Sequence, residues 1–461
     1  MQRTTDMTKG SITKLLLKFS LPLIITNIGQ QLYMIADAAI VGRGVGVRAL
    51  AAVGSADWLY WLILWTVMGF TQGFSVFIAK SFGEKNYRDM NKTIAMSTIV
   101  CAAVGIILTI CGLVAAKPVL ELLDTPQDIF DGALTYLVTM VSGTLVISAY
   151  NMASTILRAL GDGKSPLIAM LVAALMNIGL DCLFVFGFGW GIFGAAFASV
   201  IAQFFSFVYC FFRIKKISFI KLEREMWNID LALIGKIVKF CTPMAMQYMI
   251  IALGGLILQS TINLQGSFFV AGYTAVNKLY GLLECTAISF GTAFATFFSQ
   301  NYGAGNYDRM RKGVNVGFMM CLVASALIGI LFFFFSRQLL SLFLDKALEG
   351  GEQALDIGVN YLNVMSVTLL ILYLIYVYKN ILQSVQISCW SVVSGFSEFL
   401  VRVGMGKILV DMWGQNTLYF IEPSAWLAAV LTVAVPYYIM RKRILPKGRQ
   451  SVSEFSGIPK E

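Results

Sequence analysis

The sequence predicts an all-α integral membrane protein, with twelve transmembrane helices arranged as two pseudo-symmetric lobes of six helices each. Apolar residues make up 58% of the 461 residues and charged residues only 13%, whereas a soluble domain carries about 25% charged residues. The apolar residues gather in twelve runs of about 20 residues or more, which is the length that crosses a bilayer. A 23-residue phrase also occurs twice, at 70–92 and at 290–312.

Each predicted helix occupies one apolar run. In the first half the runs are 14–42, 52–79, 93–115, 132–160, 165–187 and 191–213. In the second half they are 234–263, 269–300, 314–335, 353–384, 388–411 and 418–440. The longest polar interruption, from Arg213 to Asp230, falls at the midpoint. The expected domains are therefore an N-terminal lobe (1–213), a cytoplasmic linker (214–233), a C-terminal lobe (234–440) and a basic cytoplasmic tail (441–461).

The repeated phrase indicates a duplicated domain. Eight of its 23 positions are identical, where unrelated sequences would share roughly one or two, and an offset of 220 residues is too long for a solenoid repeat. Because six spans per half is an even number, both halves enter the membrane from the same side, and the repeat is parallel. Such halves are typical of carriers that work by alternating access. The identical pairs are Phe70/Phe290, Phe74/Phe294, Phe77/Phe297, Gly83/Gly303, Asn86/Asn306, Tyr87/Tyr307, Met90/Met310 and Lys92/Lys312.

The charges predict the orientation. Basic residues cluster in the connections at 80–92, 213–224, 309–312 and 441–449, and acidic residues in those at 117–131 and 337–356. Because basic loops stay on the inner side of the membrane, we expect a multi-pass protein of the cytoplasmic membrane with both termini in the cytoplasm. Arg43 and Arg48 are a local exception. The net charge of +10 thus lies in loops that meet lipid, and no nucleic-acid partner is expected.

Enzymatic chemistry is not expected. Histidine is absent, which excludes histidine-ligated metals, haem and the Ser-His-Asp and Cys-His catalytic arrangements. The eight cysteines lie in or beside apolar runs without any CxxC pair, as small buried hydrophobes do. We therefore expect neither an enzyme nor a metal or organic cofactor.

Two aspartates inside predicted spans are the main functional candidates. Asp37 lies in the first span, and Asp181 lies in the fifth, where Asn177 precedes it by four residues and shares its helix face. An ionised side chain at mid-membrane costs on the order of 3 kcal/mol, so such acids are usually functional. Each aspartate either exchanges a proton or binds sodium, or else has a structural role in which it forms hydrogen bonds within the helix. The aligned positions in the second half carry no acid: they are Leu258, Arg402 and Gly406.

Other polar residues in the spans are weaker candidates. Asn151 and Tyr136 lie in the fourth span, where polar groups also bond between helices. In the second half, Glu284 and Gln259 are candidates to line a cavity, although Glu284 could instead pair with Lys278.

One further pair is expected to be structural. Glu398 and Arg402 lie four residues apart in the eleventh span, in the order that favours an intrahelical ion pair. A pair that neutralises itself leaves no charge for a ligand.

Four fragments together resemble the multidrug and toxic compound extrusion (MATE) transporters. They are GRGVGVRALAAVG (42–54), SFGEKNYRDM, LRALGDGKSP and SQNYGAGNYDRM. The resemblance implies a V-shaped pair of six-helix lobes that works as a monomer. It also implies an antiporter that exports organic cations, drugs or other amphipathic compounds by alternating access, in exchange for protons or sodium ions.

The DinF-like branch of that family is the most similar. Its first-lobe site joins an aspartate of span one, an Asn-x-x-x-Asp pair of span five and polar residues of span four. Matched by position, the resemblance implies an ion-coupling and substrate site at Asp37, Asn177, Asp181, Asn151 and Tyr136, with sodium as one alternative at the two aspartates.

Two features depart from related patterns, and one alternative function was considered. The seventh span lacks the carboxylate found in the NorM-like and eukaryotic branches, and the turn QSVQISCWS lacks the usual glycine. The alternative is a flippase for lipid-linked sugars of the same wider superfamily. Twelve spans and few intramembrane Lys or Arg residues argue against it, because such flippases tend to have fourteen spans and a cationic cavity.

Overall fold

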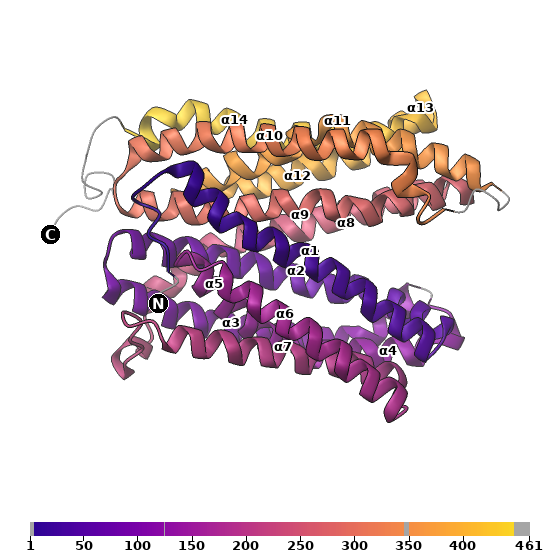
Figure 1. The fold of residues 1–461 in the computed structure, drawn as a ribbon, viewed down its shortest axis with the longest axis horizontal. Coiled ribbons are helices and arrows are strands. Elements are labelled where there is room, and N and C mark those ends of the chain that lie inside the picture. Colours follow the sequence, from indigo (N-terminus) through magenta and orange to yellow (C-terminus); the bar gives the residue numbers. More distant parts are fainter. Residues whose placement is uncertain (1–3, 124, 345–349, 447–461) are drawn as a thin grey trace. The chain divides into compact units, whose positions relative to one another are not determined.

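The computed structural model describes residues 4–123, 125–344 and 350–446, and all regular structure in these residues is helical (Figure 1). The first half contains α1 (Ile12–Gly44), α2 (Val47–Gly83), α3 (Tyr87–Leu122), α4 (Gln127–Ser142), α5 (Thr144–Ala159), α6 (Lys164–Asp181), the π-helix η1 (Cys182–Gly187) and α7 (Gly191–Lys215). After η2 (Arg224–Trp227), the second half contains α8 (Leu231–Asn263), α9 (Ser267–Gly303), α10 (Tyr307–Leu340), α11 (Gly351–Ser384), α12 (Cys389–Gly404), the π-helix η3 (Met405–Leu409), α13 (Val410–Trp413), η4 (Gln415–Phe420) and α14 (Ile421–Ile444).

The prediction of an all-helical membrane protein is confirmed. Within the described residues, ten helical segments are long and apolar enough to cross a membrane, and the pair α4–α5, bent by 45°, makes up to eleven. That pair coincides with the predicted span 132–160. The predicted span 388–411 is helical but is not among these candidates, and it carries the charged residues Glu398, Arg402 and Lys407.

The chain forms two compact units. The first unit comprises the described residues up to Asp6 together with Lys18–Ala245, and the second comprises Met7–Leu17 and the chain from Met246 onward. Compared with the predicted lobes, each unit therefore includes the start of the other half's first helix. The start of α1 belongs to the second unit, and the start of α8 belongs to the first.

The repeated phrase forms the same helix–turn–helix in both units. α2 ends at Gly83 and α3 begins at Tyr87, while α9 ends at Gly303 and α10 begins at Tyr307. The tight turn needs a left-handed residue, which is Lys85 (φ 57°) in the first copy and Gly305 (φ 67°) in the second. The duplication thus preserved backbone geometry even where the side chain changed.

Each copy of the phrase also holds the segment that leads into the other half of the chain. In the first unit, Asn91 Nδ2 donates to the carbonyl oxygen of Phe219 in the linker at 3.1 Å. In the second unit, the Met7 amide donates to Gln300 Oε1 at 2.9 Å, and Arg309 Nε donates to the Met7 carbonyl at 3.1 Å. These contacts explain why the start of α1 belongs to the second unit.

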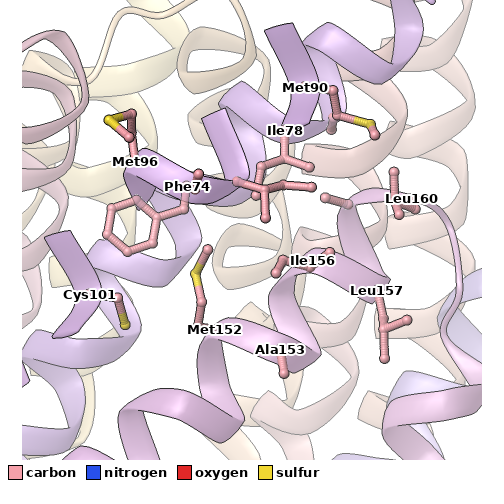
Figure 2. Packing of buried hydrophobic residues seen from close by; sticks show 14 of the residues in the cluster. Phe74, Ile78, Met90, Met96, Cys101, Met152, Ala153, Ile156, Leu157 and Leu160 are labelled. Carbon is pink, nitrogen blue, oxygen red and sulfur yellow. The ribbon is translucent and has the colours of Figure 1, made fainter. Parts of the chain in front are cut away.

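The first unit has its main core where α2, α3 and α5 meet. Figure 2 shows Phe74 and Ile78 of α2 facing Met152 and Ile156 of α5, with Met96 of α3 beside them. Phe74 is fully buried, as is its repeat partner Phe294 in the second unit. Because lipid is as apolar as these side chains, close packing rather than transfer out of water holds such helices together.

Candidate functional site

The candidate site lies in the first unit, where three helices bring polar side chains together. Tyr33 and Asp37 lie one turn apart on α1, Asn177 and Asp181 lie one turn apart at the end of α6, and Ser199 comes from α7. Asn177 and Asp181 are fully buried. The spacing of four residues on each helix places both members of a pair on the same face.

Hydrogen bonds connect these side chains in series. In the amide orientation that satisfies both of its neighbours, Asn177 donates from its nitrogen to Asp181 Oδ2 at 2.7 Å and accepts from Ser199 Oγ at 3.1 Å. Because a hydroxyl has a single proton to donate, the Tyr33 hydroxyl then donates to Ser199 Oγ at 3.2 Å. The chain therefore runs from Tyr33 through Ser199 and Asn177 to Asp181.

The chain ends at a pair of carboxyl groups. Asp37 and Asp181 are close enough to share a hydrogen bond, and two carboxyl groups can do so only when one of them is protonated. Among the described residues, the buried Oδ1 atom of each aspartate receives no N–H or O–H donor. A shared proton or a bound cation would satisfy both oxygens. In the part of the chain that the structure describes, no basic side chain forms an ion pair with either acid.

The backbone is irregular beside this pair. α6 ends at Asp181, and η1 follows at once with π-helical geometry. Single π-turns inside helices are frequent at functional sites, because they add one residue per turn and redirect the side chains. The second unit has a similar break, since η3 follows α12 and begins three residues after Arg402.

The other two predicted residues of the first unit are not part of this series of hydrogen bonds. Tyr136 of α4 is 8% exposed and lies within electrostatic range of Asp57, Tyr60 and Asp37. Asn151 of α5 donates its Nδ2 to the carbonyl oxygen of Ile147, one turn back on its own helix, at 2.9 Å. The structure thus brings together Asp37, Asn177 and Asp181 but does not connect Asn151 to them by a hydrogen bond.

Three residues near the site were missed from the sequence. Tyr33 precedes Asp37 by four residues, a spacing that indicates a shared helix face. Asp57 is an acid inside a predicted span and meets the same criterion that selected Asp37. Ser199 carried no sequence signal, because a serine in an apolar run is ordinary.

In the second unit, acidic side chains of the helices form ion pairs with a base. Arg402 forms the predicted ion pair with Glu398 (Nη2–Oε2 3.4 Å), but its shorter contacts go to Glu422 of α14, at 3.0 Å from Nε to Oε1 and 2.9 Å from Nη2 to Oε2. Only the spacing of four residues was visible in the sequence. The bidentate partner on another helix was not.

The two weaker candidates of the second unit are both half-buried. Glu284 accepts a hydrogen bond from the Tyr376 hydroxyl at 3.3 Å, and the alternative pairing with Lys278, which is exposed, does not occur among the described ion pairs. Gln259 is half-buried and donates to Asn263 Oδ1 at 2.8 Å. In the described part of the chain, no group of three or more Cys, Asp or Glu residues could hold a metal ion.

Comparison with known proteins gives one family and one fold. A family model described as MatE matches residues 22–183 and 243–408. The chain is 28% identical to "Probable multidrug resistance protein YoeA" of Bacillus subtilis (strain 168) over 351 residues, which cover 74% of this chain and 76% of the relative. It is 29% identical to "Probable multidrug resistance protein YpnP" of the same organism over 369 residues, or 77% and 82% of the two chains.

A solved structure is similar over nearly the whole chain. "Crystal structure of MATE in complex with MaL6" superposes with a TM-score of 0.87 at 20% sequence identity, covering 96% of this chain and 99% of the other. The chain therefore shares that fold over 96% of its length.

Proposed function

The chain belongs to the MatE family, and from this premise we propose that it is a multidrug efflux transporter that works as a secondary antiporter. It would export organic cations or other amphipathic compounds in exchange for protons or sodium ions. The names of the relatives support efflux and do not favour a lipid flippase. The single observation that carries the coupling role is the closeness of the Asp37 and Asp181 carboxyl groups, which are near enough to share a hydrogen bond and have no basic ion-pair partner among the described residues.

The carboxyl pair supplies a physical switch. With one proton shared, the pair carries one negative charge and draws α1 against α6. Without the proton, two like charges about 4 Å apart repel by about 4 kcal/mol at the effective dielectric of a protein. A proton, a sodium ion or a cationic substrate each relieves that repulsion, so binding of one disfavours binding of another. Competition for one site is the minimum requirement for exchange.

The remaining features of the proposal follow from the family and the sequence. We infer that the protein lies in the cytoplasmic membrane with both termini inside, acts as a monomer and resembles the DinF-like branch. The grouping of Asp37, Asn177 and Asp181 supports that branch, as does the lack of any acidic residue in α8.

The test is transport by purified protein in liposomes, with proton and sodium gradients imposed separately. The wild-type chain should drive uphill efflux of a cationic dye with one gradient only. Asp37→Asn should abolish this efflux, and cells carrying it should lose drug resistance at unchanged membrane expression. Asp131→Asn, which neutralises an exposed acid on α4, is the matched control and should transport as the wild type does. Unchanged resistance in the Asp37→Asn variant would show that the coupling role is wrong.

A further inference from the structure

In the second unit, some charged side chains among the helices do not take part in ion pairs. Its helices carry one cluster of three acids and two bases, of which Lys379, Glu398 and Arg402 are buried and Glu284 and Glu422 are half-buried. Arg402 pairs with both Glu422 and Glu398. Among the described residues, Glu284 and Lys379 have no ion pair within 4 Å, so these two remain outside the network.

Lys379 has an unusual environment for a buried ammonium group. It lies on α11, one and a half turns before the helix ends at Ser384, and is 7% exposed. Its Nζ atom lies 4.7 Å from the centroid of the Tyr376 ring and 6.0 Å from that of Tyr248. In the described part of the chain it forms no hydrogen bond. Burial disfavours its charged form, and the two rings and the charges of Glu398 and Glu284 offset part of that cost.

These neighbours are the parts of an aromatic cation site. Tyrosine faces within about 6 Å and a nearby carboxylate are what recognises alkylated ammonium ions. The parts come from three helices: Tyr248 from α8, Glu284 from α9 and Tyr376 from α11. The Tyr376 hydroxyl donates to Glu284 Oε1 at 3.3 Å, which joins the carboxylate to the aromatic wall.

We propose that Tyr248, Glu284 and Tyr376 form a binding site for alkylammonium ions in the second unit, and that the chain fills this site with its own Lys379. The excess of acids over bases makes the cluster one for cations rather than anions. Because the lysine is tethered, it occupies the site at a high effective concentration, and a free ammonium ion must displace it.

This inference deepens the proposed function, on which it rests for the class of substrate. If the exported compounds are organic cations, the internal lysine closes the cation site of the second unit to them. The unpaired acids of the first unit then remain the accessible ones. Lys379 is thus a residue that determines which unit receives the cationic group.

The test is chemical rescue. Lys379→Ala leaves the space of a propylammonium group, because alanine retains only the β-carbon. Purified full-length protein is titrated with n-propylammonium chloride, with tetramethylammonium chloride and with neutral 1-propanol, and binding is followed by calorimetry. The variant should bind both cations at millimolar concentrations, at least about tenfold more tightly than the wild type does, since a desolvated cation–π contact is worth about one such factor. It should not bind 1-propanol.

Two further variants make the result specific. Adding Glu284→Gln to Lys379→Ala should weaken cation binding by about tenfold or more, because the charged partner is lost. Lys312→Ala removes an exposed lysine from α10 and should gain no binding. Equal binding of propylammonium and 1-propanol by Lys379→Ala, or binding that survives Glu284→Gln, would overturn the proposal.

If Lys379→Ala unfolds in detergent, the proposal can still be tested by the recovery of folded protein. Propylammonium in the purification buffer should then recover folded protein, because a ligand of the native state stabilises it. Recovery that 1-propanol matches, or no recovery with either, counts against the proposal. None of these measurements needs transport. A wild-type chain that fails to pump in liposomes would refute the proposed function and leave the amine site standing.

Discussion

The two units share a scaffold and differ in how they treat buried charge. Both form the same helix–turn–helix from the repeated phrase, and both have a π-helical break after the helix that carries their central charges. In the first unit, Asp37 and Asp181 are close enough to share a hydrogen bond, and neither forms an ion pair with a base among the described residues. In the second, Arg402 pairs with two glutamates, and Lys379 lies beside the rings of Tyr376 and Tyr248. Acids that are paired with a base, as in the second unit, stabilise the fold, whereas acids without a basic partner, as in the first unit, can respond to an ion.

The largest expected effect is on transport. Asp37→Asn and Asp181→Asn should each reduce gradient-driven efflux below detection, and the double variant should be no worse, because one shared proton is lost in every case. Asparagine resembles the protonated acid, so thermal melting of the purified variants should be unchanged or higher. A clear loss of melting temperature in either single variant would mean that the acids are structural.

The next effect is on stability and belongs to the second unit. Glu422→Gln removes the bidentate partner of Arg402 and leaves a buried guanidinium undercompensated, which costs about 3–5 kcal/mol for a pair broken on one side. Denaturation of the purified protein should show this loss, whereas Glu352→Gln, at an exposed pair with Arg337, should cost about 1 kcal/mol or less. Similar losses for the two variants would contradict the contrast drawn between the units.

A smaller effect is expected along the hydrogen-bond chain of the first unit. Ser199→Ala removes the link between Tyr33 and Asn177 and should cost about 1–3 kcal/mol, because buried polar partners lose a bond. Tyr33→Phe removes only the terminal donor and should cost about 0.5–1.5 kcal/mol. A double-mutant cycle measures their coupling. Additive losses would indicate that the two side chains do not interact.

The smallest effect compares the two copies of the turn. Gly305→Ala places a β-carbon at a left-handed residue and should destabilise the protein by about 1 kcal/mol. Lys85→Gly relieves the same strain in the first copy and should be neutral or stabilising by a few tenths of a kcal/mol, after the entropy of glycine is counted. A loss on Lys85→Gly as large as that on Gly305→Ala would mean that the Lys85 side chain has another role.

Most of the fold could be predicted from the sequence, whereas only part of the candidate sites could. Ten of the predicted spans are single candidate helices and one is the bent α4–α5 pair, because apolar length alone decides what crosses a bilayer. The exception, at α12, arises where buried charge interrupts the apolar pattern. Asp37, Asn177 and Asp181 were predicted and lie together, since each is an exception within an apolar run. Asp57 could have been found by the same rule.

The sequence by itself determined the membrane class, the duplication and the identity of most buried acids. These depend on composition and on spacing along one helix, and both can be read without knowing what packs against what. The tertiary structure alone decided the partners. Ser199 joins Tyr33 across 166 residues, and Glu422 binds Arg402 from another helix. Whether a buried charge is shared, paired or boxed in by aromatic rings depends on which helix faces meet, and packing in three dimensions sets that.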